Sequence, residues 1–151
     1  MNYIKAVVLL LIEIYNLVQQ TIKAIYPKYY PQEVVDFFCE LHSVDNIRKD
    51  IKKQTVFTLY DNDDLVGTGC LSENHITRVY VLPEYQGKGY GTYIIKQLES
   101  EIKKEYDCAV LDASLPAVML YEKLGYNTVN HNKYPVENNV VLVYEVMEKK
   151  L

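Results

Sequence analysis

Apolar residues recur with the period of an α-helix in the first third of the chain. One face of the segment 7–24 is apolar and the opposite face is polar. The apolar positions are Val7, Leu11, Ile14, Val18 and Ile22, and the polar positions are Glu13, Asn16, Gln20 and Lys23. Two prolines in the segment 26–31 interrupt this pattern, because proline disfavours helix in the residue before it. A second helix is expected from Pro31 or Gln32, and Asp45 is predicted to cap a short third helix.

The pattern changes to that of strands from Thr55 onward. Three runs rich in β-branched and aromatic residues, 55–60, 65–71 and 76–82, are separated by short polar turns. They predict an antiparallel meander of three strands. Residues 3–6 give only a weak strand pattern.

Helices and strands alternate in the rest of the chain. A helix is predicted over 90–106, because Ile94, Leu98 and Ile102 recur every four positions. The segment 108–112 is short and apolar, which is typical of a buried strand parallel to its predecessor. The remaining predicted elements are a helix from Ser114 to Leu124 ended by Gly125, a strand over 126–129, a loop over 131–135 and a strand over 140–146. This order predicts an α/β fold (α+β mixed) with a mixed sheet.

A glycine-rich turn joins the third predicted strand to the helix that follows it. Pro83 ends the strand, and Gly87, Gly89 and Gly91 permit tight turns and close approach of a ligand. The first N–H groups of a helix have no internal partner and carry partial positive charge, so this turn predicts an anion cradle suited to a diphosphate. The spacing matches neither the Walker A loop nor the dinucleotide fingerprint.

Composition is that of an ordinary globular protein. The chain has 151 residues, 49% of them hydrophobic, which predicts one domain spanning 1–151. Its net charge of −4 argues against binding of nucleic acid by bulk electrostatics. Cys39, Cys70 and Cys108 lie among apolar neighbours and are interpreted as buried thiols of a reducing compartment. The apolar run 6–12 imitates a signal peptide but is interrupted by Glu13, so a core helix is preferred and no membrane contact is expected.

Two motifs resemble those of the GCN5-related N-acetyltransferase (GNAT) family. The first is Gln86-x-x-Gly89-x-Gly91 following Val79-x-Val81-x-Pro83, and the second is Ala117-x-x-x-Tyr121-x-x-x-Gly125-Tyr126. They lie at the separation expected in that family, and the resemblance covers about residues 54 to 148. It implies a mostly antiparallel central sheet that splays open at the acetyl-CoA site, between the strand ending near Pro83 and the strand ending near Asp112. Residues 54–151 would form this core, and the helices of 1–53 would shape the acceptor site.

The resemblance also assigns roles to individual residues. The backbone of Val79, Tyr80 and Val81 would pair with pantetheine, and the Val81 N–H would polarise the acetyl carbonyl. Tyr121 would protonate the departing thiolate of CoA, although one Tyr among 15 means little without its context. The residues that would hold the cofactor are Val79, Tyr80, Val81, Gln86, Gly87, Lys88, Gly89, Tyr90, Gly91, Thr92 and Ser114. Ser114 stands where many members have Asn, and Tyr126 where Phe is usual.

The general base is not fixed by the sequence. Glu73 is the preferred candidate, with a water chain as its alternative, and His75, Glu84 and Asp112 are further candidates that are more often turn, cap or surface residues. His42 and His131 are expected in loops. No spacing of His, Cys and Asp indicates a metal site.

Three functions remain open at this point. The first is an N-acetyltransferase that moves acetyl from acetyl-CoA to a primary amine by direct attack in a ternary complex. The second is a catalytically silent CoA-binding sensor, and the third is an interaction domain that keeps only the fold. The acceptor would be a small-molecule or peptide amine bound near Tyr26, Tyr29, Tyr30 and Tyr134, the chain would be cytoplasmic, and a homodimer is an open alternative.

Overall fold

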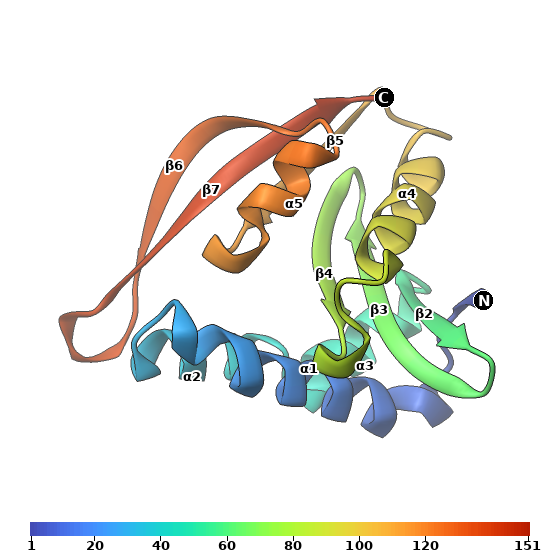
Figure 1. The fold of residues 1–151 in the computed structure, drawn as a ribbon, viewed down its shortest axis with the longest axis horizontal. Coiled ribbons are helices and arrows are strands. Elements are labelled where there is room, and N and C mark those ends of the chain that lie inside the picture. Colours follow the sequence, from blue (N-terminus) through green and yellow to red (C-terminus); the bar gives the residue numbers. More distant parts are fainter.

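One seven-stranded sheet with helices on both faces makes up the chain (Figure 1). The computed structural model describes residues 1–151. The strands are β1 (Asn2–Lys5), β2 (Val56–Asp61), β3 (Asp64–Ser72), β4 (His75–Val81), β5 (Cys108–Ala113), β6 (Asn127–Pro135) and β7 (Val141–Lys150). The helices are α1 (Leu11–Ile25), α2 (Gln32–Leu41), α3 (Val44–Lys52), α4 (Tyr90–Ile102) and α5 (Val118–Lys123). Short 3₁₀ turns are η1 (Val8–Leu10), η2 (Tyr26–Lys28), η3 (Pro83–Tyr85), η4 (Leu115–Ala117) and η5 (Glu137–Asn139).

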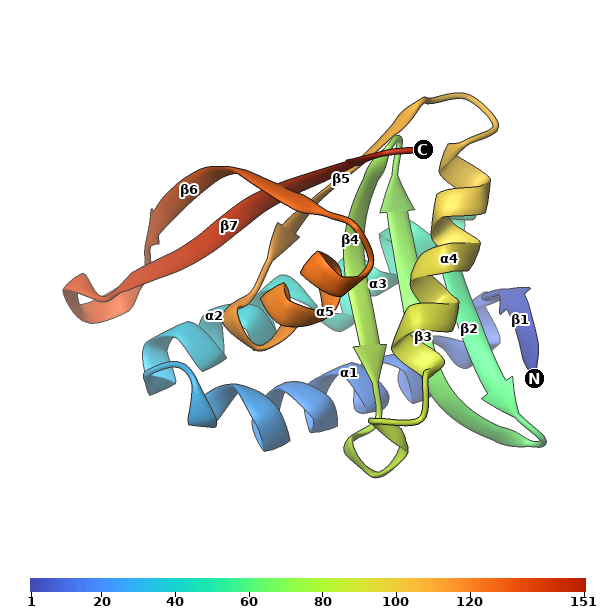
Figure 2. The same ribbon diagram turned by 45° about the horizontal axis from the view of Figure 1, so that its top comes forward.

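The sheet has the strand order β1-β2-β3-β4-β5-β7-β6, and only β4 and β5 are parallel. These two strands share just two register pairs, His75 with Val110 and Ile76 with Leu111. Beyond Ile76 they diverge, so the second half of β4 has a hydrogen-bonded neighbour on one side only (Figure 2). This divergence is the splay that the resemblance implied.

Each face of the sheet has its own hydrophobic core. Helix α1 packs across β3 and β4 on one face, with α2 and α3 beside it, and α4 covers β3 and β4 on the other face. Gly67 and Gly69 of β3 allow α4 to lie very close, because a Cβ at either position would lie 2.7 Å from Ile94. Tyr80 belongs to the first core and Val81 to the second, as the alternation of a strand requires.

The predicted order of elements is confirmed, and two local predictions are wrong. Ser43, rather than Asp45, caps α3, because its hydroxyl accepts a hydrogen bond from the Asn46 N–H at 3.2 Å. The segment His131–Pro135 is not a loop but the second half of β6, which is antiparallel to β7. Its side chains are almost all exposed, so the strand carries no alternation of apolar and polar residues that a sequence could reveal.

The N-terminal helix is part of the first core. By length and composition alone the helical stretch Val8–Lys28 could cross a membrane, a criterion that the core helix of a globular protein also meets. Leu17, Val18 and Ile22 are buried against the sheet, as the prediction of a core helix requires. All three cysteines are free. The prediction of a buried thiol is confirmed for Cys70 and wrong for Cys39 and Cys108, which are partly exposed.

Candidate active site

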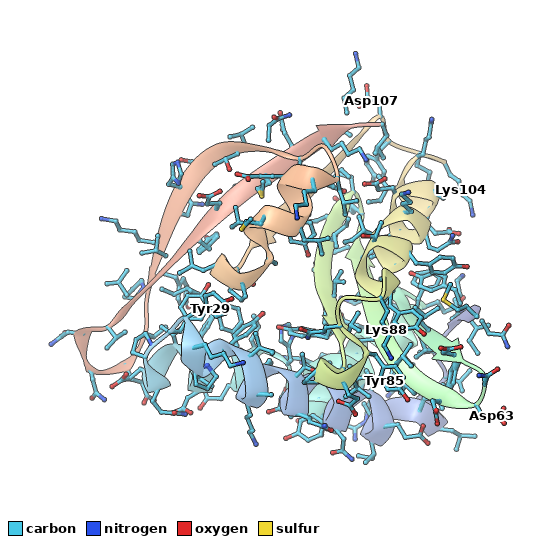
Figure 3. The ribbon with its side chains drawn as sticks, in the orientation of Figure 1. Tyr29, Asp63, Tyr85, Lys88, Lys104 and Asp107 are labelled. Atoms are coloured by element: carbon cyan, nitrogen blue, oxygen red, sulfur yellow. The ribbon has the colours of Figure 1, made fainter.

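A cavity of about 800 Å³ opens where β5 diverges from β4. Its wall is made by β4, the β4–α4 loop, the first turn of α4, the segment from Ser114 to Tyr121, and the connection between α1 and α2. Figure 3 labels Tyr29 and Tyr85, which line the cavity from the α1–α2 connection and from the β4–α4 loop. The cavity lies at the carboxyl end of β4, where α/β sheets commonly bind ligands.

The free edge of β4 offers backbone hydrogen-bonding groups to this cavity. The Leu82 N–H donates to the Val66 carbonyl at 3.0 Å, so Leu82 and, two residues earlier, Tyr80 face β3. Val79 and Val81, which alternate with these two residues along β4, therefore direct their N–H and C=O groups towards the splay. The Val81 carbonyl accepts a hydrogen bond from Gln86 Nε2 at 2.9 Å. Of the three residues predicted to pair with pantetheine, Tyr80 uses its backbone groups to bond β3. Its side chain lies on the face of the sheet opposite to the side chains of Val79 and Val81.

The β4–α4 loop has the geometry of an anion cradle. Gly87 and Gly89 have φ of +77° and +88°, a region that residues with a Cβ seldom adopt, and no atom lies within 4 Å of where their Cβ would be. The first hydrogen bond of α4 joins the Tyr93 N–H to the Gly89 carbonyl, so the N–H groups of residues 90–92 have no acceptor in the helix.

Nearly all of the predicted loop residues line the cavity. They are Gln86, Gly87, Gly89, Tyr90, Gly91 and Thr92. Lys88 does not: its ammonium lies 5.2 Å from the centre of the Tyr85 ring, and Figure 3 labels the two residues close together at the β4–α4 loop. Tyr90 is held by a hydrogen bond from its hydroxyl to the Asp61 carboxylate. Lys88 therefore adds positive charge near the cradle but is not part of the cavity wall.

Tyr121 of α5 lines the same cavity as the β4–α4 loop. Its side chain is 8% exposed, its ring packs edge-on against that of Tyr126 at 5.7 Å, and it lines the cavity. Burial raises the pKa of Tyr121, with a smaller contribution from Tyr26 and none from a hydrogen bond. The hydroxyl therefore keeps its proton and has no partner within the chain.

Buried tyrosines join the two halves of the molecule across the splay. The Tyr26 hydroxyl donates to Ser114 Oγ at 3.3 Å and shares a hydrogen bond with the Tyr80 hydroxyl at 3.2 Å. The Leu115 N–H donates to the Tyr30 hydroxyl at 2.7 Å. Ser114, predicted as a cofactor contact, thus lines the cavity and is also bound by Tyr26. Tyr134 packs 5.1 Å from Phe37 and lies outside the cavity lining.

A second cavity, of about 440 Å³, adjoins the first on the face covered by α2 and α3. Arg78 lines both cavities and is 5% exposed. Its Nη2 donates to Asp50 Oδ2 at 2.9 Å and its Nε donates to His42 Nδ1 at 3.1 Å. Burial, with the Arg78 charge adding to it, lowers the pKa of His42 to about 3, so this imidazole is neutral. His42 lies in the turn between α2 and α3, so the prediction of a loop is confirmed, and the residue is buried there.

Arg78 was missed by the sequence analysis. The signal was present, since it is a lone cation within an apolar strand, Ile76 to Leu82. A charged residue at a buried strand position needs partners from elsewhere in the fold, and the sequence does not say which. The structure supplies them from α2 and α3.

The candidates for the general base are not equivalent in space. Glu73 lies at the tip of the β3–β4 turn with φ of +56°. Both Glu73 and Glu84 are exposed, and neither lines a cavity. His75 Nε2 lies 3.6 Å from Asp112 Oδ2 at the junction of β4 and β5. Asp112 lines both cavities and His75 the second one. No group of three or more His, Cys, Asp and Glu side chains could hold a metal ion.

Comparisons with solved structures identify the same architecture elsewhere. A GCN5-related N-acetyltransferase from Rhodopseudomonas palustris superposes with a TM-score of 0.91 at 21% identity, over 99% of this chain and 95% of that one. The PaiA N-acetyltransferase from Thermoplasma acidophilum, solved in complex with coenzyme A, has a TM-score of 0.79 at 18% identity, over 99% and 98% of the two chains. At these identities the likeness establishes the fold.

Curated relatives match over shorter stretches. An uncharacterized acetyltransferase of Streptococcus pyogenes is 38% identical over 82 residues, and the match spans 50% of this chain and 58% of the relative. Thialysine N-epsilon-acetyltransferase of Mus musculus is 42% identical over 55 residues, which are 34% of this chain and 32% of that protein. The chain thus spans little more than half the length of the first of these relatives.

The family model described as acetyltransferase (GNAT) domain matches residues 25–151. That range holds the diverging strands β4 and β5, the cradle of α4 and Tyr121. The chain belongs to the GNAT acetyltransferase family.

Proposed function

We propose that this chain is an N-acetyltransferase that moves an acetyl group from acetyl-CoA to a primary amine by direct attack in a ternary complex. The observation that carries the proposal is the free edge of β4, with Val79 and Val81 directed into a cavity that ends at the unpaired N–H groups of α4. An extended chain of amides ending in a diphosphate matches these two features. Family membership and the coenzyme A complex of the Thermoplasma protein support this choice of donor.

The residues present fit acetyl-CoA as the donor. The backbone groups of Val79 would bind a pantetheine amide, and the Val81 N–H would polarise the acetyl carbonyl. Gln86 and the N–H groups from Gly87 to Thr92 would hold the pyrophosphate. Bound acetyl-CoA would supply the thioester, whose acetyl group is already activated for transfer. Residues 1–151 would form one domain, in which 1–53 shape the acceptor side.

Tyr121 is the proposed proton donor to the departing thiolate. Burial raises its pKa, which makes its match to a thiol in water poorer than the ordinary values of the two groups suggest. The same cavity also disfavours a thiolate and raises the pKa of that group. Both shifts have the same direction, so the transfer stays feasible and is favoured by a short hydrogen bond.

Few side chains are positioned to remove the proton from the acceptor amine. Of the candidates, only Asp112 and His75 line a cavity, and their 3.6 Å contact lies where the strands begin to diverge. Glu73, the base preferred from sequence, has no support from its position. Asp112, with His75 beside it, or an intervening water is therefore the proposed route for that proton.

The test is release of CoA from acetyl-CoA by a panel of amines, with Tyr121→Phe as the variant. Loss of one general acid should lower kcat by roughly 10²-fold with little change in the affinity for acetyl-CoA. Tyr126→Phe is the matched control, because its hydroxyl bonds Glu99 at 3.0 Å and does not line the cavity. Binding of acetyl-CoA without turnover by any amine would favour the sensor and refute the enzyme. An unchanged kcat in Tyr121→Phe would remove Tyr121 from the chemistry.

A further inference from the structure

Arg78 carries a hydrogen-bonding group that the chain itself does not use. Its Nε and Nη2 are bonded to His42 and Asp50, whereas Nη1 is buried and has no partner. Buried polar groups of native proteins almost always have a partner, in the protein or in a bound molecule. A guanidinium that is 5% exposed and lacks an acceptor on one nitrogen therefore indicates an acceptor supplied from outside the chain.

The position of Arg78 indicates which molecule supplies that acceptor. Arg78 immediately precedes Val79, whose backbone faces the splay, but its side chain lies on the other face of the sheet, with α2 and α3. It is one of the residues that line both cavities, together with Leu41, His42, Ile76, Thr77 and Asp112. A ligand in the second cavity would therefore reach Arg78 while lying next to the donor site rather than within it.

Charges around the second cavity are separated into two groups. Lys49 and Lys53 of the α3 region lie in its lining with Arg78, and Asp50 already compensates one of these cations. Asp112 lies in the same lining, on β5 beside His75. A molecule with an anionic group towards Arg78 and an amine towards Asp112 would complement both groups. A volume of about 440 Å³ is within the usual range for a small-molecule site.

We propose that the acceptor is an amine that also carries a carboxylate, and that Arg78 binds this carboxylate through Nη1. The inference rests on the proposed acetyl transfer and names the class of its second substrate. A carboxylate suits the site better than a phosphate, because Asp50 already compensates the Arg78 charge and only one nitrogen remains free. In this arrangement Arg78 binds substrate, and His42 and Asp50 hold its guanidinium in position.

Two variants separate binding of a carboxylate from a structural role. Arg78→Met and Asp50→Asn both break the Arg78–Asp50 ion pair, but only Arg78→Met removes Nη1. Each protein is assayed for CoA release with acceptors that differ only in a carboxylate, such as leucine and leucinamide or lysine and cadaverine. Thermal stabilisation by acetyl-CoA is measured on the same samples as a readout of the donor site.

The parent should favour the carboxylate member of each pair by roughly 10- to 100-fold in kcat/KM, the range expected for a charge-assisted hydrogen bond. Arg78→Met should lose this preference and keep its stabilisation by acetyl-CoA. Asp50→Asn should keep the preference, because the amide oxygen of Asn can still accept the hydrogen bond from Arg78 Nη2. Where Arg78→Met does not fold, stabilisation of the parent by N-acetylleucine but not by N-acetylleucinamide gives the supporting result.

Three outcomes overturn the inference. The first is a parent that treats the two members of each pair alike, or that favours phosphoethanolamine over both. The second is a preference that survives in Arg78→Met, and the third is an equal loss in Arg78→Met and Asp50→Asn, which would make Arg78 purely structural. Failure of the proposed function itself has a different signature: no stabilisation by acetyl-CoA, or no turnover of any amine, in the parent.

Discussion

His42 should make the protein less stable as the pH falls, and the structure gives the size of this effect. Its pKa is lowered from 6.5 to about 3, first by burial and then by Arg78. The unfolded chain takes up a proton on His42 below its ordinary pKa, whereas the folded chain stays neutral there until about pH 3. The unfolded state therefore binds more protons throughout this window, and the free energy of unfolding falls as the pH is lowered.

The magnitude follows from the width of the window. Each pH unit well inside it costs about 1.4 kcal/mol, so lowering the pH from about 7 to about 5 should remove about 2 kcal/mol of stability through His42 alone. That is a large share of the roughly 5–15 kcal/mol by which domains are usually stable. Carboxylates elsewhere titrate as well, but they do so equally in a variant that lacks the imidazole.

His42→Asn is the informative change. The amide oxygen of Asn is separated from Cβ by the same number of bonds as Nδ1, so it can still accept the hydrogen bond from Arg78 Nε without titrating. The free energy of unfolding of parent and variant should be measured by urea denaturation at several pH values between about 5 and 8. The variant starts with a loss from the missing ring, but the gap between the curves should narrow by about 2 kcal/mol towards pH 5.

Parallel curves would refute this reasoning. They would mean that His42 has the same pKa in the folded and the unfolded state, as it would if its surroundings were open to water. A gap that widens towards low pH would place a favourable charge on folded His42. Because Arg78 Nε must donate to an unprotonated Nδ1, that result would also contradict the hydrogen bond of 3.1 Å between them.

Two further predictions concern glycines. Gly91→Ala should not strain the backbone, since its Cβ would meet only Leu120 at 3.6 Å and Val81 at 4.0 Å, and it should leave the melting temperature equal or higher. It should nevertheless weaken binding of acetyl-CoA in a thermal-shift titration, and unchanged affinity would exclude Gly91 from the cradle. Gly67→Ala should destabilise by about 1–3 kcal/mol in chemical denaturation, because its Cβ would lie 2.7 Å from Ile94 Cδ1. Adding Ile94→Val removes that carbon and should recover part of the loss, so strictly additive effects would contradict the proposed close packing.

The sequence could predict most of the fold because its regular elements follow local rules. The apolar stripe of α1 and the strand–glycine–helix pattern around Gly89 have periods that appear within a few residues. The predicted strand 126–129 was shorter than β6, because the pairing of β6 depends on β7 and its exposed side chains show no alternation. Ser43 and Asp45 are both good capping residues, and only the actual hydrogen bond decides between them.

The site was predictable where it follows from a motif and hidden where it depends on packing between distant segments. The cradle residues and Tyr121 lie in contiguous stretches, and the structure brings them to one cavity. The bonds among His42, Asp50 and Arg78 join residues from α2, α3 and β4. No local pattern links these three residues, so neither the burial of His42 nor the free nitrogen of Arg78 could be anticipated.

The narrow junction between β4 and β5 has a mechanical consequence. Strands β5 and β7 are joined along six register pairs, whereas β4 and β5 are joined along two. A sheet joined in this way consists of two rigid parts with a flexible connection between them, since backbone hydrogen bonds resist shear only where they are present. The hydrogen bonds of Tyr26 with Ser114 and of Tyr30 with Leu115 form a second connection between these two parts. The width of the cavity therefore depends on the hydroxyl groups of Tyr26 and Tyr30 as well as on the two β4–β5 register pairs.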